Sequence, residues 1–315
     1  MFDGARDRAV GLGYAAGWGL VKSLPPAVSR RAFGAVADAA SVRNGRGTQQ
    51  LRKNLRRVVG PAMSELRMDA LVTEALRSYA RYWLETFTLE TMDHDAVIAN
   101  FERHNTGVEH LDAGLAAGKG VILALPHSGN WDASGLWLVH HSGPFTTVAE
   151  RVKPDSVFDR FVAYRESLGM EVVALTGGER PPTGVLAGRL RQNRVVCLLA
   201  DRDLSRNGVE VDFFGEPARM PPGPALLAAM TGATLLAVHP FYADDGGWGH
   251  DIGPPIDLGD GRLRDKVRTG TQQMADRFAH RIAGRPADWH MLQRLWLADL
   301  TPRPVTPESA PALAD

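Results

Sequence analysis

Residues 121–132 read VILALPHSGNWD, and this stretch decides the fold class. Its first five residues form a short continuous apolar run, which is typical of a strand buried on both faces of a sheet. The turn-forming residues 126–130 follow, and residues 131–140 have a helical pattern. The stretch therefore predicts a strand, a tight turn and a helix in that order, which is the basic unit of an α/β protein.

The same alternation continues along the chain. It predicts strands at residues 145–149, 170–175, 194–200 and 234–241, and helices at 156–168, 181–192 and 224–231. Strands that alternate with helices of this length indicate a central mixed, mostly parallel sheet with helices on both faces. We therefore predict an α/β fold.

The part before residue 119 is predicted to be mainly helical. Its clearest helix covers residues 69–88, where apolar and aromatic residues recur at helical spacing and Asp69 is a candidate cap. A further helix at 108–117 stops at a glycine turn. The expected organisation is one domain over residues 1–300, with a helical part (1–118), an α/β core (119–300) and a disordered Pro- and Ala-rich tail (301–315).

Composition excludes several classes of protein. Lys+Arg and Asp+Glu both total 36, so the net charge is zero and no nucleic-acid partner is expected. Cys197 is the single cysteine, which rules out an intrachain disulfide, a CxxC redox motif and a cysteine-based zinc site. Its apolar neighbours predict a buried hydrophobe in a reducing, cytosolic protein. We find no secretory signal, and no apolar run of the ~20 residues that span a bilayer.

The first 60 residues are locally basic, with eleven Lys and Arg against three Asp, a net charge of plus eight. Within them, residues 10–24 are apolar and rich in glycine. Apolar helices flanked by cations suit an interfacial membrane anchor. The alternative is a pair of helices packed on the core with a solvated basic face.

His127 is the first candidate for chemistry. It directly follows a predicted buried strand, and ligands of open α/β sheets bind at the carboxyl ends of the strands. A neutral imidazole can remove a hydroxyl proton near pH 7, and a carboxylate such as Asp132, five residues on, can orient it. A lone histidine at a strand end is more often structural, so the motif alone leaves both interpretations open.

Four blocks of sequence carry a family resemblance. The motif at 127–132 resembles the signature of the lysophospholipid acyltransferase superfamily, in the branch close to the lipid A lauroyl and myristoyl transferases. The segments 201–204, 211–223 and 286–290 are similar to further conserved blocks of that branch. The resemblance runs from about residue 50 to 300.

The segments 147–151, 164–169 and 177–182 are similar to a mycobacterial subfamily that acylates mannosylated phosphatidylinositol. This resemblance implies transfer of a palmitoyl-type chain from acyl-CoA, as co-substrate and without a cofactor. The implied acceptor is the 6-hydroxyl of a mannose on phosphatidylinositol mono- or dimannoside. A lipid acceptor favours the anchor interpretation of the N-terminal segment, on an anionic membrane surface at the cytoplasmic face of the plasma membrane.

The resemblance also implies roles for individual residues. His127 corresponds to the base that activates the hydroxyl for direct attack, and Asp132 to the motif acid. Family members pair the histidine with a glutamate where this chain has Asp201, whose side chain is one methylene shorter. The sequence therefore leaves open whether Asp132 or Asp201 pairs with His127.

Three further charged residues, Glu150, Arg165 and Arg202, match positions expected near the acceptor. Their charges suit hydrogen bonding to sugar hydroxyls and to the inositol phosphate. The alternative for Glu150 and Arg165 is a surface ion pair, and for Arg202 a salt-bridged turn with Asp203.

Rival functions fit the sequence less well. A serine esterase needs a G-x-S-x-G nucleophile elbow, which the chain lacks. The dinucleotide-like match at residues 11–16 has no preceding strand. A metal site has no third ligand at suitable spacing near His127 or His140. Two alternatives stay open: an acyltransferase of the same family with another glycolipid or lysophospholipid acceptor, and a non-catalytic membrane protein that binds lipid.

Overall fold

A computed structural model describes residues 2–177, 181–203 and 208–300, and the side chains from Val10 onward. The predicted tail at 301–315 lies outside the described residues. Within them, a six-stranded sheet has the order β3-β2-β4-β1-β7-β8. β8 runs antiparallel to β7 and the other neighbouring strands pair in parallel. The strands are β1 (Val121–Leu125), β2 (Thr146–Ala149), β3 (Glu171–Ala174), β4 (Val195–Leu199), β7 (Thr234–Tyr242) and β8 (Trp248–Ile252). The predicted mixed, mostly parallel sheet is confirmed.

β1 lies in the middle of the sheet and is buried on both faces, as its continuous apolar run predicts. Ile122 and Ala124 belong to one hydrophobic core, whereas Val121, Leu123 and Leu125 belong to another. This division follows from the alternation of side chains along a strand. The sheet therefore separates two cores and must be covered by helices on both faces.

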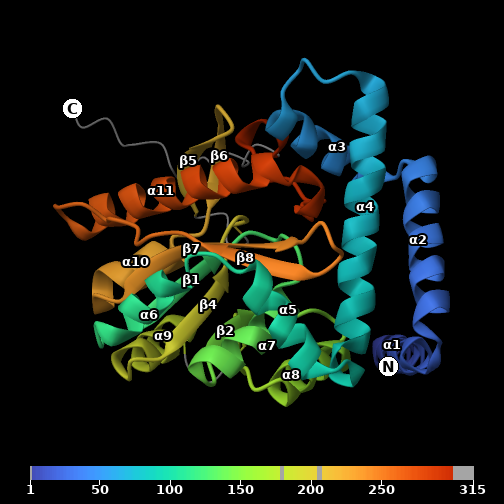
Figure 1. Cartoon of the computed structure of the whole chain (residues 1–315), viewed down its shortest axis with the longest axis horizontal. Helices are drawn as coiled ribbons and strands as arrows, with labels where there is room; N and C mark the ends of the chain where they lie inside the picture. Colours follow the sequence, from blue (N-terminus) through green and yellow to red (C-terminus); the bar gives the residue numbers. More distant parts are fainter. Residues whose placement is uncertain (1, 178–180, 204–207, 301–315) are drawn as a thin grey trace, which may run out of the picture.

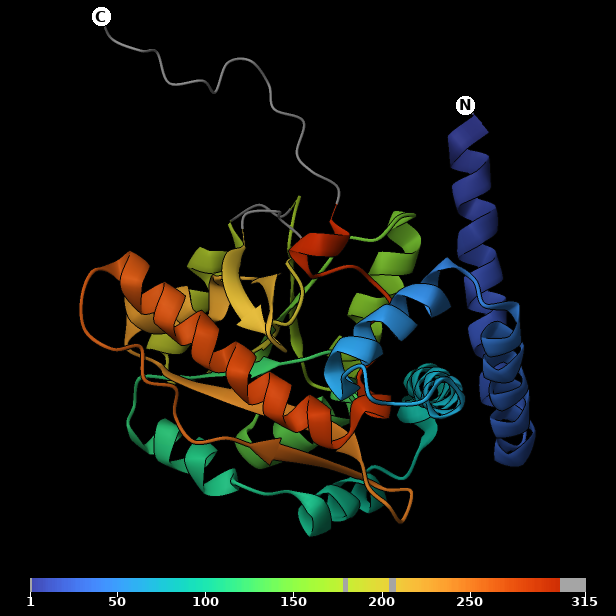
Figure 2. The same ribbon diagram turned by 90° about the horizontal axis from the view of Figure 1, so that it is seen from above.

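Helices cover each core, and their positions confirm the prediction (Figures 1 and 2). Side chains of α9, α10 and α11 enter the core that contains Ile122, and those of α5 to α8 enter the other. These helices are α5 (His94–His104), α6 (Val108–Ala116), α7 (Trp131–Ser142), α8 (Asp155–Ser167), α9 (Pro182–Arg191), α10 (Gly223–Thr231) and α11 (Leu263–Gly284).

The chain before residue 89 forms four helices: α1 (Phe2–Ser23), α2 (Pro26–Arg43), α3 (Arg46–Val59) and α4 (Glu65–Thr88). Figure 1 shows α4 standing beside the sheet with α2 along its outer side. Helix α4 begins earlier than predicted, because Ser64 and not Asp69 provides the cap. The Ser64 hydroxyl accepts from the Arg67 backbone N–H at 3.4 Å, and Asp69 forms an ion pair with Arg52.

Some elements lie outside the predicted series, including strand β8 and helix α11. Strands β5 (Val209–Phe213) and β6 (Glu216–Met220) form a separate antiparallel hairpin. The 3₁₀ segments η1 (Leu89–Thr91), η2 (Pro286–Asp288) and η3 (Leu297–Asp299) are also additional. Of the helices in the described ranges, none is long and apolar enough to cross a bilayer.

Gly129 shows how closely the turn after β1 approaches the rest of the fold. Its φ is +55°, and a Cβ there would lie 2.8 Å from the backbone N of Phe241 and the carbonyl carbon of Pro240, both in β7. A side chain at this position therefore meets two penalties, a left-handed backbone and a clash with a central strand.

We expect Gly129→Ala to lower the free energy of unfolding clearly more than Gly118→Ala does. Gly118 has a φ of +75°, but nothing lies within 4 Å of a Cβ there, so it isolates the backbone penalty of about 1–2 kcal/mol. Urea unfolding of both variants measures the difference. Equal losses for the two variants would contradict the described contact with β7.

Candidate active site

Strand register brings His127 and Asp201 together. Leu125 of β1 pairs with Leu199 of β4, so the residues two positions beyond each strand end also lie side by side. The ring Nδ1 of His127 lies 2.5 Å from Oδ1 of Asp201. The backbone N–H of His127 donates to Oδ2 of the same carboxylate at 2.9 Å. His127 is thus held to Asp201 through both its ring and its backbone.

Asp201 is completely buried, and its contacts favour the ionised form of its carboxyl. Burial alone would raise the pKa of its carboxyl, but the charge of His127 and hydrogen bonds from His127 and Trp289 hold that pKa below its usual value. Because the carboxylate can only accept, Nδ1 of His127 must carry the proton of their hydrogen bond. The lone pair of the neutral ring is then on Nε2, and the His127 side chain is 26% exposed.

Asp132 has a different partner. It lies in the first turn of α7 and is 1% exposed. Its carboxylate accepts from Nε of Arg165 at 2.8 Å and from the hydroxyl of Tyr82 at 3.1 Å. Desolvation lowers the pKa of the Arg165 guanidinium, but the Asp132 charge outweighs it and holds that pKa above its usual value. The structure therefore pairs His127 with Asp201, and Asp132 with Arg165.

Asn130 fixes the turn between these two pairs. Its Oδ1 accepts from the Ala133 backbone N–H at 2.9 Å and so caps α7, the helix that carries Asp132. Its Nδ2 donates to Oε2 of Glu85 in α4 at 2.7 Å. Helix α4 thereby holds the motif turn from outside the α/β core.

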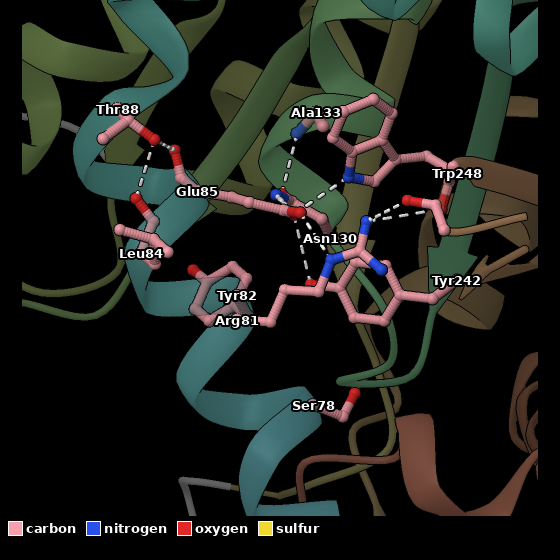
Figure 3. Close-up of polar contacts among 12 residues, drawn as sticks. Ser78, Arg81, Tyr82, Leu84, Glu85, Thr88, Asn130, Ala133, Tyr242 and Trp248 are labelled. Carbon is pink, nitrogen blue, oxygen red and sulfur yellow. Dashed lines mark hydrogen bonds and ion pairs between the residues drawn. The ribbon is translucent and has the colours of Figure 1, made fainter. Parts of the chain in front are cut away.

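Glu85 is the centre of a buried polar cluster that our sequence analysis did not identify (Figure 3). Besides Asn130, its Oε2 accepts from the Trp248 indole N–H at 2.9 Å and the Tyr242 hydroxyl at 3.3 Å, and its Oε1 accepts from Nε of Arg81 at 2.6 Å. The cluster joins α4 to β7, β8 and the motif turn. The sequence does contain a signal that could have identified Glu85, because an acidic residue within the aromatic stretch 79–89 is unusual.

Glu150 and Arg202 lie at the same edge of the sheet, after β2 and β4 respectively. Nη2 of Arg202 is 3.4 Å from Oε2 of Glu150, and the Glu150 side chain is 55% exposed. Glu150 therefore pairs with Arg202, and not with Arg165. The structure brings all six residues singled out from the sequence together in three pairs. Five of them follow β1, β2 or β4 in the chain, and Arg165 reaches Asp132 from the last turn of α8.

An apolar cavity adjoins one of these pairs, Asp132 and Arg165. It lies between α7 and the sheet, where Leu123, Leu125 and Leu199 line it, and Trp131, Asp132 and Arg165 also reach it. Cys197 lines the cavity as well, and burial raises the pKa of its thiol well above the usual range. A protonated thiol is a poor nucleophile, so Cys197 behaves as an apolar lining residue.

Among the described residues, no group of three or more His, Cys, Asp or Glu side chains is arranged to hold a metal ion.

Comparison with known proteins identifies the family. A model of the bacterial lipid A biosynthesis acyltransferases matches residues 8–298. The chain belongs to this family of acyltransferases. It is 56% identical over 288 residues to a phosphatidylinositol mannoside acyltransferase of Mycobacterium tuberculosis strain CDC 1551, covering 91% of this chain and 89% of the relative.

Two further relatives support the assignment. A phosphatidylinositol mannoside acyltransferase of Mycolicibacterium smegmatis is 55% identical over 92% of each chain. A lipid A biosynthesis acyltransferase of Haemophilus influenzae is 29% identical over 49% of this chain and 48% of its own. The family resemblance read from the sequence is confirmed, and this acyltransferase is similar to the mycobacterial proteins over nearly its whole length.

The Glu85 cluster predicts a large loss of stability in Glu85→Ala. Arg81 and the other donors lose a buried carboxylate, which costs about 3–5 kcal/mol of unfolding free energy. Glu65→Ala, on the same helix, is the control, since Glu65 is 73% exposed where it pairs with Arg52 and Arg56, and its loss costs less than about 1 kcal/mol. Chemical denaturation of both variants tests this, and a small loss in Glu85→Ala would refute the structural role.

Proposed function

We propose that this acyltransferase transfers a long acyl chain, palmitoyl-like in length, from acyl-CoA to the 6-hydroxyl of a mannose of phosphatidylinositol mono- or dimannoside. The observation that carries the proposal is the identity of more than half the residues with phosphatidylinositol mannoside acyltransferases across about nine-tenths of both chains. The single family match from residue 8 to 298 supports one domain over residues 1–300.

His127 is the base of the proposed reaction. With Nδ1–H bonded to Asp201, Nε2 accepts the proton of the mannose hydroxyl as its oxygen attacks the thioester carbonyl carbon. The carboxylate of Asp201 stabilises the imidazolium that results. No acyl-enzyme is needed, because the hydroxyl oxygen attacks the thioester directly.

The second step returns the proton. The tetrahedral intermediate collapses, the carbon–sulfur bond breaks, and the imidazolium donates its Nε2 proton to the leaving thiolate of CoA. The ester and free CoA are the products, and His127 is neutral again. Charge and atoms balance without a cofactor.

The remaining residues have supporting roles in this proposal. The apolar cavity between α7 and the sheet suits the acyl chain of the donor. Asp132 orients Arg165, which lies at the cavity, and the exposed Glu150–Arg202 pair suits hydroxyl and phosphate groups of the glycolipid.

The N-terminal helices are the proposed membrane contact, at the cytoplasmic face of the plasma membrane. Several apolar side chains on α1 and α2 face solvent, including Leu12 at 71%, Leu20 at 59% and Val36 at 67% exposure. Arg30 and Arg31 of α2 are exposed as well. Exposed apolar and cationic side chains on one pair of helices suit an anionic membrane surface.

His127→Ala and Asp201→Asn should each lower the rate of transfer from radiolabelled palmitoyl-CoA to mannosylated phosphatidylinositol by at least about 100-fold. His141→Ala should leave the rate unchanged, although His141 also contacts a carboxylate, that of Asp112 at 2.8 Å. Wild-type rates in His127→Ala would refute the mechanism. Absence of transfer by the wild type would favour a non-catalytic lipid-binding protein, and activity on lysophospholipids alone would favour another acceptor.

Leu12→Glu combined with Leu20→Glu should weaken co-sedimentation with phosphatidylinositol-containing vesicles by tenfold or more, because two apolar side chains leave the proposed contact. Leu66→Glu is the control, since Leu66 is 81% exposed but lies at the start of α4. Vesicle binding that survives in the double variant would contradict docking through α1.

A further inference from the structure

Trp289 contacts Asp201 through the carboxylate oxygen that the His127 ring does not bind. Its indole N–H donates to Oδ2 of Asp201 at 2.9 Å, and both residues are completely buried. Oδ2 also accepts the backbone N–H of His127, so both donors hold one oxygen. Oδ1 is thereby left facing Nδ1 of the His127 ring.

The backbone on either side of Trp289 holds the loop that carries His127. The N–H of His290 donates to the carbonyl of His127 at 2.7 Å, and the N–H of Gly129 donates to the carbonyl of Asp288 at 3.0 Å. Ser128 and Trp289 form an antiparallel bridge between these two bonds. Residues 288–290 therefore bind the His127 loop through their backbone and the Asp201 side chain through one indole.

This arrangement fixes the relative position of two residues that lie 74 positions apart in the chain. An aspartate carboxylate can turn about its terminal torsion, which has broad minima. Two N–H donors on one oxygen remove that freedom. Residues 288–290 also hold the loop that carries His127 in position. Neither His127 nor Asp201 can therefore shift independently of the other.

We propose that Trp289 is a positioning residue for the transfer reaction, which orients the Asp201 carboxylate toward His127 through its indole N–H. The proposal rests on the proposed role of His127 as base. Trp289 itself contacts neither substrate, and its effect passes through Asp201.

Trp296 provides a matched control. It is also completely buried in the same hydrophobic core, and its indole N–H donates to the backbone carbonyl of Phe213 at 2.9 Å. The two indoles pack edge to face with ring centroids 6.0 Å apart. Trp→Phe at either position removes one buried indole and one hydrogen bond, but only at Trp289 does that bond end on Asp201.

We expect Trp289→Phe to lower kcat about tenfold or more, with KM for both substrates nearly unchanged, because the Asp201 carboxylate loses a donor that orients it toward His127. Trp296→Phe should stay within about twofold of wild type. In the double variant with Asp201→Asn, the Trp289 substitution should add less than about twofold, since it acts through the carboxylate that is already gone.

The pH profile separates positioning from general loss of stability. The Trp289 bond helps to lower the pKa of Asp201, so its loss raises that pKa. This rise moves the acidic limb of kcat/KM to higher pH, because the Asp201 carboxylate is then protonated at higher pH than in the wild type. His290 does not contribute, because burial and the charge of His127 lower its pKa to about 3.

Comparison of the two Trp variants distinguishes a positioning role from a general structural role of a buried indole. The positioning role would be overturned if Trp289→Phe gave a lower plateau of kcat/KM with an unshifted acidic limb. Equal losses of kcat in both Trp variants would overturn it as well. Histidine NMR provides a readout without turnover: the resonance of the His127 Nδ1 proton, which lies in the hydrogen bond to Asp201, should shift in Trp289→Phe and stay at its wild-type position in Trp296→Phe. Full activity in His127→Ala would instead refute the proposed mechanism, so the two failures are distinguishable.

Discussion

The buried carboxylate of Asp201 is the constraint on which the site depends. A charge with no solvent exposure is stable only if its oxygens are satisfied, and here the donors are the ring and backbone of His127 and the indole of Trp289. The two donor residues, His127 and Trp289, come from different parts of the chain. Burial of this one charge therefore requires β1, β4 and the segment after α11 to meet at one point, and the same contacts leave Nε2 of His127 as the free base.

Helix α4 contributes a second buried carboxylate, that of Glu85, which has a structural role. Glu85 binds Asn130, Tyr242 and Trp248, so it fixes the motif turn against the β7–β8 edge of the sheet. Tyr82, one turn earlier, donates to Asp132. Burial, and then the charge of Glu85, raise the pKa of the Tyr242 phenol well above its usual value, so it remains a donor. The helical N-terminal part is thus a structural component of the site, which explains why the family match begins well before β1.

The fold could be predicted from the sequence because its signals are local. Apolar runs, glycine turns and helical spacing mark β1 and the alternating elements that follow. The partner of His127 was not predictable in this way, because Asp132 is five residues distant in the chain and Asp201 is 74, and only the β1–β4 register decides between them. Glu85 was missed for a related reason. Its partners lie on α7, β7 and β8, and no spacing within α4 reveals them.

The two aspartates differ because their partners differ. Asp132 faces Arg165, whose charge is permanent, so this pair has the same electrostatic energy at every stage of a proton transfer. Asp201 faces an imidazole that gains a charge when it takes a proton, so its attraction is strongest at the moment when charge develops. Only an interaction that strengthens along the reaction lowers the barrier. In the proposed reaction the electrostatic role therefore belongs to Asp201, and the motif aspartate holds the guanidinium of Arg165 in place at the first turn of α7.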